Sequence, residues 1–307
     1  MVRLNRRQLL LAAAAFGGAT ACEAARSPQS QTERAPSGVP QRIVVLEWLL
    51  VENLLALGIQ PVGVADQEQY RQFVNIEATL SEEAAGVGTR QEPSLEAITQ
   101  LEPDLILGVG YRHAGIRQSL AAIAPVRLFE PYPPPEKADQ LTRRCAILQT
   151  MAELTQRQER GQAVLARMQA TFAQAARQLA EANLSTQAFV LAQLQPGAPQ
   201  MRLFTDNALA VQVLSELGLT NAWPGSPKRF GFNTGWLDAL PPVEAANFLY
   251  VAQTDNPRLS ELQQNPVWQD LQFVREGHTY PLGADTWLFG GPLSAEVLAR
   301  QAVKALT

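Results

Sequence analysis

The chain has 307 residues, of which 46% are hydrophobic and 18% are charged, as expected for a globular protein of one large or two medium domains. Its formal net charge of -4 argues against a general nucleic-acid binder. With only two cysteines and two histidines, a disulfide scaffold is excluded and a zinc cage of these residues is not expected.

The N-terminal segment has the features of an export signal. Three arginines near the start are followed by an apolar stretch, 9–16, and then by small residues. The end of this segment, Ala-Thr-Ala-Cys at 19–22, resembles a bacterial lipobox, in which the cysteine is acylated. We therefore predict an export signal over 1–21, lipid attachment at Cys22 and a polar tether over 22–40, which would hold the protein in the periplasm on the outer face of the cytoplasmic membrane.

Strands and helices alternate in residues 41–140, which we predict to form an N-terminal lobe. Short apolar runs separated by Gly and Pro indicate strands, and apolar residues at helical spacing indicate helices. This alternation predicts a mainly parallel sheet with helices on its faces. The expected strands cover 42–47, 60–66, 104–109 and 126–130, and the expected helices cover 48–57, 94–101 and 113–123.

A long helix is predicted over 156–184, where apolar residues recur every three or four positions. A shorter helix, 141–154, precedes it and carries Cys145, which we assign to the core. We interpret 141–184 as a helical connection whose long helix holds two lobes apart. The alternative is a helix within a single larger domain.

Residues 185–307 repeat the same order of elements and predict a C-terminal lobe. The predicted fold class is therefore α/β, with two Rossmann-like lobes joined by one long backbone helix. Trp236 and Trp268 lie at helical spacing and are assigned to the core. Strands are expected over 188–194, 247–252 and 278–282, and helices over 209–217, 267–274 and from Ser294 onward.

Several sequence motifs of enzymes are absent. The chain has no G-x-x-x-x-G-K-[ST] and no G-x-S-x-G, and the glycines at 108 and 110 lack the third glycine of a dinucleotide loop. His113 could act as a base oriented by Asp104, but no nucleophile lies in a matching turn. The sequence favours a binding protein over an enzyme.

Arginine and aromatic residues gather at predicted strand ends and loops in both lobes, where open α/β sheets bind ligands. Guanidinium groups suit carboxylates and other oxyanions, and flat rings suit an apolar or delocalised ligand. Each arginine alone could be a solvated surface residue, and His113 could satisfy a backbone group. The candidates are Arg90, Tyr111, Arg112 and His113 in the first lobe and Arg202, Trp223, Arg229, Phe230, Trp287 and Phe289 in the second.

Four segments resemble the iron–siderophore substrate-binding proteins of ABC importers. They are RIVVLEWLLVENLLALGIQPVGVAD, VGTRQEPSLEAITQLEPDLILGV, YRHAGIRQSLAAIAP and NPVWQDLQFVREGHTYPLGADTWLFGGPLSAEVLA, and the likeness extends over 41–305. The first is similar to the ferric-hydroxamate branch, and 112–125 is closer to the ferric-citrate branch. The resemblance implies the class III periplasmic binding protein type of fold, with two lobes on one long helix.

The resemblance also implies roles for individual residues. Arg90 would contact the iron-chelating oxygens, and Trp287 would form an aromatic wall. Phe230 stands where the hydroxamate binders have a tryptophan. The remaining matches are Tyr111, an aromatic neighbour, and Arg112 and Arg202, basic positions of the citrate branch.

The implied ligand is a ferric siderophore of the citrate-hydroxamate or hydroxamate type. Because the chelator saturates the iron with oxygen donors, we expect no protein metal ligand and no cofactor. The expected partners are an ABC permease with its ATPase, docked through Asp238 and a first-lobe position near Ile116, and the protein is expected to be a monomer. The alternatives are a cobalamin or haem binder on the same scaffold and an exported α/β hydrolase or transferase.

Overall fold

The computed structural model describes residues 38–137, 139–184, 187–195, 197, 200–253 and 256–307. The predicted export signal, the lipid attachment site Cys22 and the tether up to residue 37 lie outside these residues. Across the described part of the chain, no helix is both long enough and apolar enough to cross a membrane.

The first lobe contains a five-stranded parallel sheet in the order β3-β2-β1-β4-β5. The central strands are fully buried, as expected for a parallel sheet covered on both faces. All four predicted strands are present, whereas the short β3 was not predicted. The strands are β1 (Ile43–Val45), β2 (Gly63–Val64), β3 (Ala85–Gly86), β4 (Leu105–Val109) and β5 (Val126–Phe129).

The predicted helix 113–123 is divided into three pieces in the structure. A four-residue helix and a 3-10 turn precede the regular helix, and Gly115 in the turn lowers the helix propensity of this stretch. The other predicted helices of the lobe are confirmed. The helices are α1 (Trp48–Ala56), α2 (Gln67–Phe73), α3 (Leu95–Gln100), α4 (Gly110–His113), η1 (Ala114–Ile116) and α5 (Arg117–Ile123).

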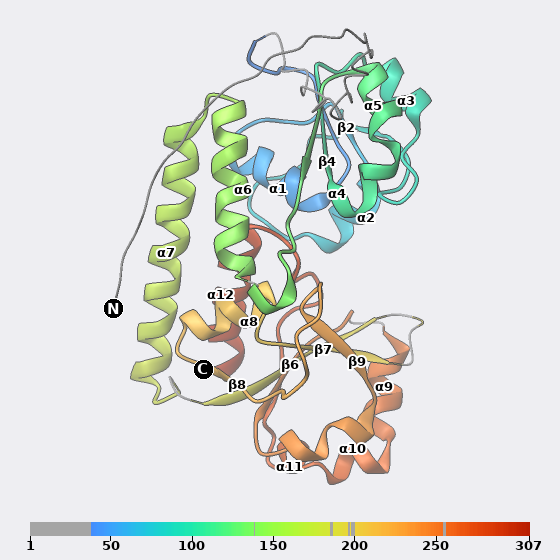
Figure 1. Cartoon of the computed structure of the whole chain (residues 1–307). Coiled ribbons are helices and arrows are strands. Elements are labelled where there is room, and N and C mark those ends of the chain that lie inside the picture. The colour runs from blue at the N-terminus through green and yellow to red at the C-terminus, as the bar shows by residue number, and fades with distance from the viewer. Residues whose placement is uncertain (1–37, 138, 185–186, 196, 198–199, 254–255) are drawn as a thin grey trace, which may run out of the picture. The chain divides into compact units, whose positions relative to one another are not determined.

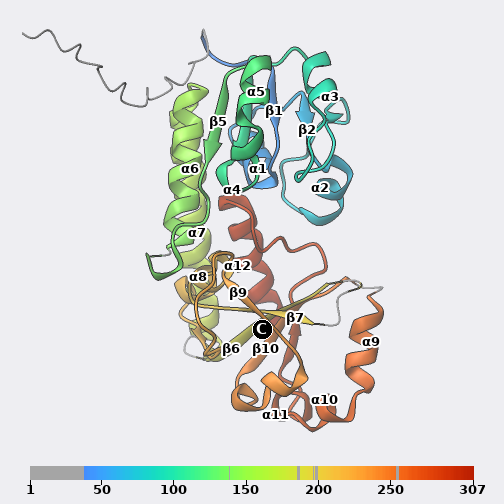
Figure 2. The same ribbon diagram turned by 45° about the vertical axis from the view of Figure 1, so that its right-hand side comes forward.

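The long helix is α7 (Gln158–Glu181), which runs beside α6 (Gln140–Leu154) along both lobes (Figures 1 and 2). Its Val164 packs in the first-lobe core, and its Met168 and Phe172 pack in the second-lobe core. One amphipathic face of α7 is thus shared by the two lobes, which is the role predicted for it. The described residues belong to one compact unit.

A second connection joins the lobes through a buried carboxylate. Glu52 on α1 is fully buried and accepts hydrogen bonds from the backbone N–H and the hydroxyl of Ser294, at 2.9 and 2.6 Å. Ser294 lies at the start of α12 (Pro292–Leu306), which packs along α7. A carboxylate at a helix N-terminus satisfies free backbone N–H groups and complements the helix dipole.

The second lobe contains a six-stranded mixed sheet in the order β11-β10-β6-β7-β9, with β8 beside β6. The predicted parallel scheme holds for β6, β8, β10 and β11, but β7 and β9 run antiparallel. The connection from β6 to β7 is too short for a crossover, so β7 must turn back against β6. The strands are β6 (Ala188–Leu194), β7 (Met201–Phe204), β8 (Thr220–Asn221), β9 (Phe232–Gly235), β10 (Asn247–Val251) and β11 (Thr279–Pro281).

The second-lobe helices differ from the prediction at two points, of which the first is the helix 257–264, which was not predicted. The expected helix 267–274 is interrupted at Leu271, whose ψ of 139° is extended. Trp268 is buried as predicted, but Trp236 is 48% exposed, so its assignment to the core was wrong. Trp236 follows β9 with extended backbone rather than lying in a helix. The helices are α8 (Leu209–Glu216), α9 (Pro257–Gln264), α10 (Pro266–Asp270), α11 (Gln272–Arg275) and α12.

Candidate ligand-binding cavity

A cavity of about 420 Å³ is lined by residues of both lobes. This volume lies within the range of small-molecule sites. The first lobe contributes the loops that follow its five parallel strands, and the second lobe contributes β7, β9 and the ends of β6 and β10. The segment after β11 completes the wall.

The first-lobe wall lies where the strand order reverses direction. Chain connections pass from β1 to one side through β2 and β3 and to the other side through β4 and β5. Glu47 follows β1 after one intervening residue, and Tyr111 and Arg112 follow β4. A crevice at the carboxyl ends of two such strands is the usual ligand site of an open α/β sheet.

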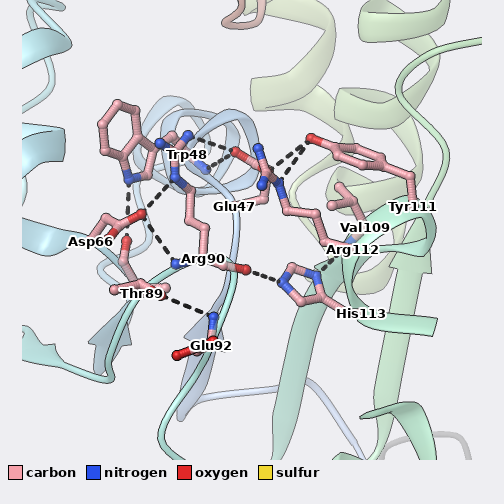
Figure 3. Close-up of polar contacts among 11 residues, drawn as sticks. Glu47, Trp48, Asp66, Thr89, Arg90, Glu92, Val109, Tyr111, Arg112 and His113 are labelled. Atoms are coloured by element: carbon pink, nitrogen blue, oxygen red, sulfur yellow. Dashed lines mark hydrogen bonds and ion pairs between the residues drawn. The ribbon is translucent and has the colours of Figure 1, made fainter. Parts of the chain in front are cut away.

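Glu47 is the centre of the polar network in this lobe (Figure 3). Its carboxylate accepts from Arg90 Nη1 at 3.2 Å, from Arg112 Nε at 3.0 Å and from the Tyr111 hydroxyl at 3.0 Å. It also accepts from the backbone N–H of Trp48 at the start of α1. Only 7% of Glu47 is exposed, so these hydrogen bonds offset the cost of burying its charge.

Arg90 is held rigidly by three neighbours. Its Nε donates to Asp66 at 2.9 Å, and its backbone N–H donates to the same carboxylate oxygen at 3.1 Å. Its guanidinium lies 3.7 Å from the ring centre of Trp48, in a cation–π contact. Asp66 adopts a left-handed conformation with φ 49°, which turns its side chain away from capping α2 and towards Arg90.

The protonation states of Tyr111 and Arg112 depend on their burial and on the charge of Glu47. Burial, and then the Glu47 charge, raises the pKa of Tyr111 well above its usual range, so the hydroxyl remains a donor. Burial by itself would lower the pKa of Arg112, but Tyr111 and Glu47 outweigh it and the pKa is raised. Arg112 therefore remains a cation at the cavity wall.

His113 lies behind the wall and fixes Arg90 from the backbone side. Its Nδ1 accepts from the N–H of Val109 at 2.9 Å, so its Nε2 carries the proton and donates to the carbonyl of Arg90 at 2.9 Å. A Cβ at Gly108 would lie 2.8 Å from Nδ1, so glycine leaves room for the ring. The prediction that His113 contacts the ligand is corrected to a positioning role, because its ring is buried and both nitrogens are used.

The state of His113 makes stability depend on pH. Burial lowers the pKa of His113 below its usual value, so the unfolded chain binds a proton more readily than the native state. The contribution of His113 to the free energy of unfolding should therefore be constant above about pH 6.5. Below that pH the free energy of unfolding should fall, by at most about 1.4 kcal/mol per pH unit for one proton. Urea unfolding at several pH values measures this dependence.

Two glutamine variants isolate the contribution of the buried histidine. His113→Gln should flatten the pH dependence below about pH 6.5, because an amide can still donate to the Arg90 carbonyl but cannot titrate. His278→Gln is the matched control, since His278 is exposed beside Glu276 and should leave the profile unchanged. An identical slope for the wild type and His113→Gln would contradict this assignment.

Arg202 on β7 is the main cation of the second-lobe wall. It lies opposite Gln193 in the β6–β7 register and donates to that amide oxygen from Nη1 at 2.9 Å. Its guanidinium also lies 4.6 Å from the ring centre of Phe232 and 5.5 Å from that of Phe289. Among the described residues no carboxylate pairs with it, and burial lowers the pKa of its guanidinium.

Aromatic rings of the two lobes meet at two places around the cavity. At one, Phe230 of the second lobe lies 5.7 Å from Tyr111 and 4.9 Å from Tyr132, between ring centres. At the other, Trp287 lies 5.0 Å from Trp48 of the first lobe. These contacts give the cavity flat apolar walls beside its guanidinium groups.

The structure brings most of the predicted site residues together. The wall includes Arg90, Tyr111, Arg112, Arg202, Phe230, Trp287 and Phe289. Trp223 lies outside it and donates from its indole to Asn233 at 3.0 Å, which ties its loop to β9. Arg229 also lies outside the wall, with its guanidinium 5.1 Å from the ring centre of Tyr111. Asp238 is exposed in the turn η3 (Leu237–Ala239).

The sequence analysis missed many of the wall residues, among them Glu47, Tyr132 and Arg144. Glu47 could have been found, since an acid just after a buried strand occupies the same kind of position as Tyr111. Tyr132 follows β5, so the same rule would have included it, whereas Arg144 lies in α6 and gave no such signal. Only tertiary packing brings Arg144 to the cavity.

Two α/β lobes on a shared helix, with a ligand-sized cavity at facing strand ends, define a solute-binding protein of the class III type. Residues 43–286 match the family described as "Periplasmic binding protein", and the chain belongs to this family. The predicted fold class is thereby confirmed, and the family is one of binding proteins rather than enzymes.

The chain is similar to proteins named for ferric ligands. It is 32% identical to the iron(3+)-hydroxamate-binding protein FhuD of Escherichia coli over 268 residues, 87% of each chain. It is 30% identical to the Fe(3+) dicitrate-binding periplasmic protein FecB of Escherichia coli over 266 residues, 86% of this chain and 84% of FecB. The structure of the Fe3+–Desferal-bound siderophore-binding protein FhuD from Vibrio cholerae has a TM-score of 0.80 at 30% identity, covering 87% of this chain and 97% of that one. The resemblance to iron–siderophore binding proteins is confirmed.

Proposed function

We propose that this protein binds an iron(III)–siderophore complex of the citrate-hydroxamate or hydroxamate type in the cavity and delivers it to an ABC permease. The observation that carries the proposal is the Arg202 guanidinium, which is half-buried in the cavity wall and has, among the described residues, an amide but no carboxylate as partner. An anionic ligand would supply the missing charge and a charge-assisted hydrogen bond.

The residues of the cavity wall suit a metal ion that is already bound by a chelator. Among the described residues, no group of three or more His, Cys, Asp or Glu could hold a metal ion. Of the side chains with a carboxylate or a phenol that line the cavity, Glu47 and Tyr111 are engaged with each other and with arginines. We therefore propose that the siderophore keeps all of the hard oxygen ligands of the iron and that the protein contacts the chelator alone.

The names of the relatives support the ligand class and the transport role. Escherichia coli FhuD and FecB are named for ferric hydroxamate and ferric dicitrate, and the Vibrio cholerae structure holds Fe3+–Desferal. A relative that is 44% identical over 87 residues, 28% of this chain, is named a putative ABC transporter substrate-binding lipoprotein. Export to the periplasm, a lipid anchor at Cys22, docking through Asp238 on a permease with its ATPase, and action as a monomer are parts of the same proposal.

Haem is less well matched by this wall. The described residues that line the cavity include no histidine, cysteine or methionine, which are common axial ligands of haem iron. Of its two tyrosines, Tyr111 and Tyr132, the first donates its hydroxyl to Glu47. His113 lies behind the wall with both ring nitrogens bonded to the backbone. A ferric chelate needs no such ligand, so the site favours it.

Intrinsic tryptophan fluorescence tests the proposal, because Trp48 and Trp287 line the cavity. Titration with ferric citrate-hydroxamate or ferric hydroxamate complexes should quench the emission with a Kd at or below about 1 µM. Iron-free chelator and ferric EDTA serve as controls for inner-filter and non-specific effects. No saturable quenching by any of these siderophore complexes at about 10 µM would refute the proposal, and absorbance titrations with haem and cobalamin would test the alternatives.

A further inference from the structure

A second arginine without a counter-ion lies at the cavity, outside both sheets. Arg144 belongs to α6, lines the cavity and is only 1% exposed. Its Nε and Nη2 are buried without a hydrogen-bond partner, and its guanidinium lies 4.6 Å from the ring centre of Tyr132. Within the described residues, no carboxylate forms an ion pair with it.

The burial of Arg144 is costly and is not required by the helix. A buried guanidinium that lacks hydrogen bonds loses its hydration without compensation, and a cation–π contact offsets only part of that loss. The next residue, Arg143, is exposed and donates from Nε to the carbonyl of Glu130. The same helix thus presents one arginine to solvent and the other to the cavity.

The charges around the cavity divide into a balanced group and an unbalanced group. In the first lobe, Arg90 and Arg112 are paired with Glu47 and Asp66. Arg202 and Arg144 have no carboxylate partner among the residues that the structure describes. The cavity wall therefore presents two cations that no described carboxylate compensates, which favours an anionic ligand.

Aromatic rings of the cavity wall lie between the two unbalanced arginines. The ring centre of Tyr132 lies 4.6 Å from the guanidinium of Arg144, and Tyr132, Arg144 and Arg202 all line the same cavity. Phe230 connects the two, since it lies 4.9 Å from Tyr132 and 6.4 Å from Phe232, on which Arg202 rests. Together Arg144, Arg202 and Tyr132 form what we name the anion subsite.

We propose, on the basis of the function proposed above, that the anion subsite binds a free carboxylate of the chelator that does not coordinate iron. A ferric trishydroxamate is neutral, because its hydroxamate anions balance the charge of the ferric ion, and it has no such group to offer. A citrate-derived chelate can carry an uncoordinated carboxylate, which two guanidiniums can hold through charge-assisted hydrogen bonds. Arg144 is thus a specificity-determining residue for carboxylate-bearing ferric chelates.

The test compares two ligands in two variants by tryptophan quenching at one pH and one ionic strength. Arg144→Met should weaken binding of a ferric citrate-hydroxamate by at least about tenfold, while binding of a neutral ferric trishydroxamate should change less than about twofold. Arg143→Met, the matched control on the same helix, should change neither affinity. Circular dichroism and a melting curve check that each variant is folded.

The result that overturns the inference is a change by the same factor for both ligands, or no change for either. Failure of the wild type to bind either chelate would instead refute the proposed function. A ligand-side test does not depend on the folding of a methionine variant. Converting the free carboxylate to an amide should cost the wild type at least about tenfold in affinity and should cost Arg144→Lys less, because an ammonium lacks the planar fork of guanidinium. An equal cost in the two proteins would also overturn the inference.

Discussion

Replacing Arg202 by methionine should weaken binding of an anionic ferric chelate by about 2–4 kcal/mol, roughly a 30- to 1,000-fold loss of affinity. Arg202 is half-buried on β7 and has the Gln193 amide as its hydrogen-bond partner, so the ligand anion meets a cation that no carboxylate of the described residues neutralises. Methionine preserves the contact with the rings of Phe232 and Phe289 and removes the charge. Tryptophan quenching measures the change.

The same substitution should stabilise the empty protein. Burial lowers the pKa of Arg202 in the native state, so folding disfavours the protonated form of this side chain. At neutral pH the side chain is nevertheless protonated in both the folded and the unfolded state. Removing the charge removes that cost, so the free energy of unfolding in urea should rise. Arg275→Met, at an exposed position on α11, is the control for both measurements. Unchanged affinity, or a loss of stability, would contradict the role given to Arg202.

Replacing Glu47 by glutamine should lower the free energy of unfolding by about 3–5 kcal/mol, because breaking a buried ion pair leaves its partners uncompensated. The carboxylate accepts hydrogen bonds from Arg90, Arg112 and Tyr111. Glutamine has nearly the same shape but leaves two neighbouring guanidiniums without their shared counter-ion. Equilibrium unfolding in urea measures the loss.

A double-mutant cycle identifies the cause of that loss. In an Arg112→Met background, Glu47→Gln should cost less than in the wild type, since one of the two repelling cations is gone. Glu96→Gln, at an exposed position on α3, should have little effect and serves as the control. Additive costs in the cycle would show that the carboxylate stabilises the protein without acting through Arg112.

The fold was predictable where the residue pattern within a single helix or strand is enough to identify that element. The buried run of β4 and the amphipathic face of α7 are local signals, and each was read correctly. The antiparallel pair β7 and β9 was missed, because strand direction depends on connection length and partners rather than on local pattern. The break at Leu271 was missed for a similar reason, since its neighbours remain at helical spacing.

The site was predictable where a residue follows a strand of a parallel sheet. Arg90, Tyr111 and Arg112 were found in this way, and the same rule would have included Glu47. His113 shows the limit of the approach: its residue type suggested chemistry, whereas its neighbours determine a structural role. Arg144 shows the opposite limit, because an arginine within an amphipathic helix is normally solvated and only tertiary packing buries it.

The helix α7 gives Val164 to one core and Met168 to the other, within about one turn of each other. A wide hinge opening would have to pull apart close-packed apolar side chains on at least one side of that turn, which is costly in a dense interior. The cavity is therefore preformed, and little of the binding free energy is used to rearrange the protein. If the protein delivers its ligand to a permease, as proposed above, the permease would accordingly distinguish the loaded from the ligand-free protein by the covered rim of the cavity rather than by a large change in the separation of the two lobes.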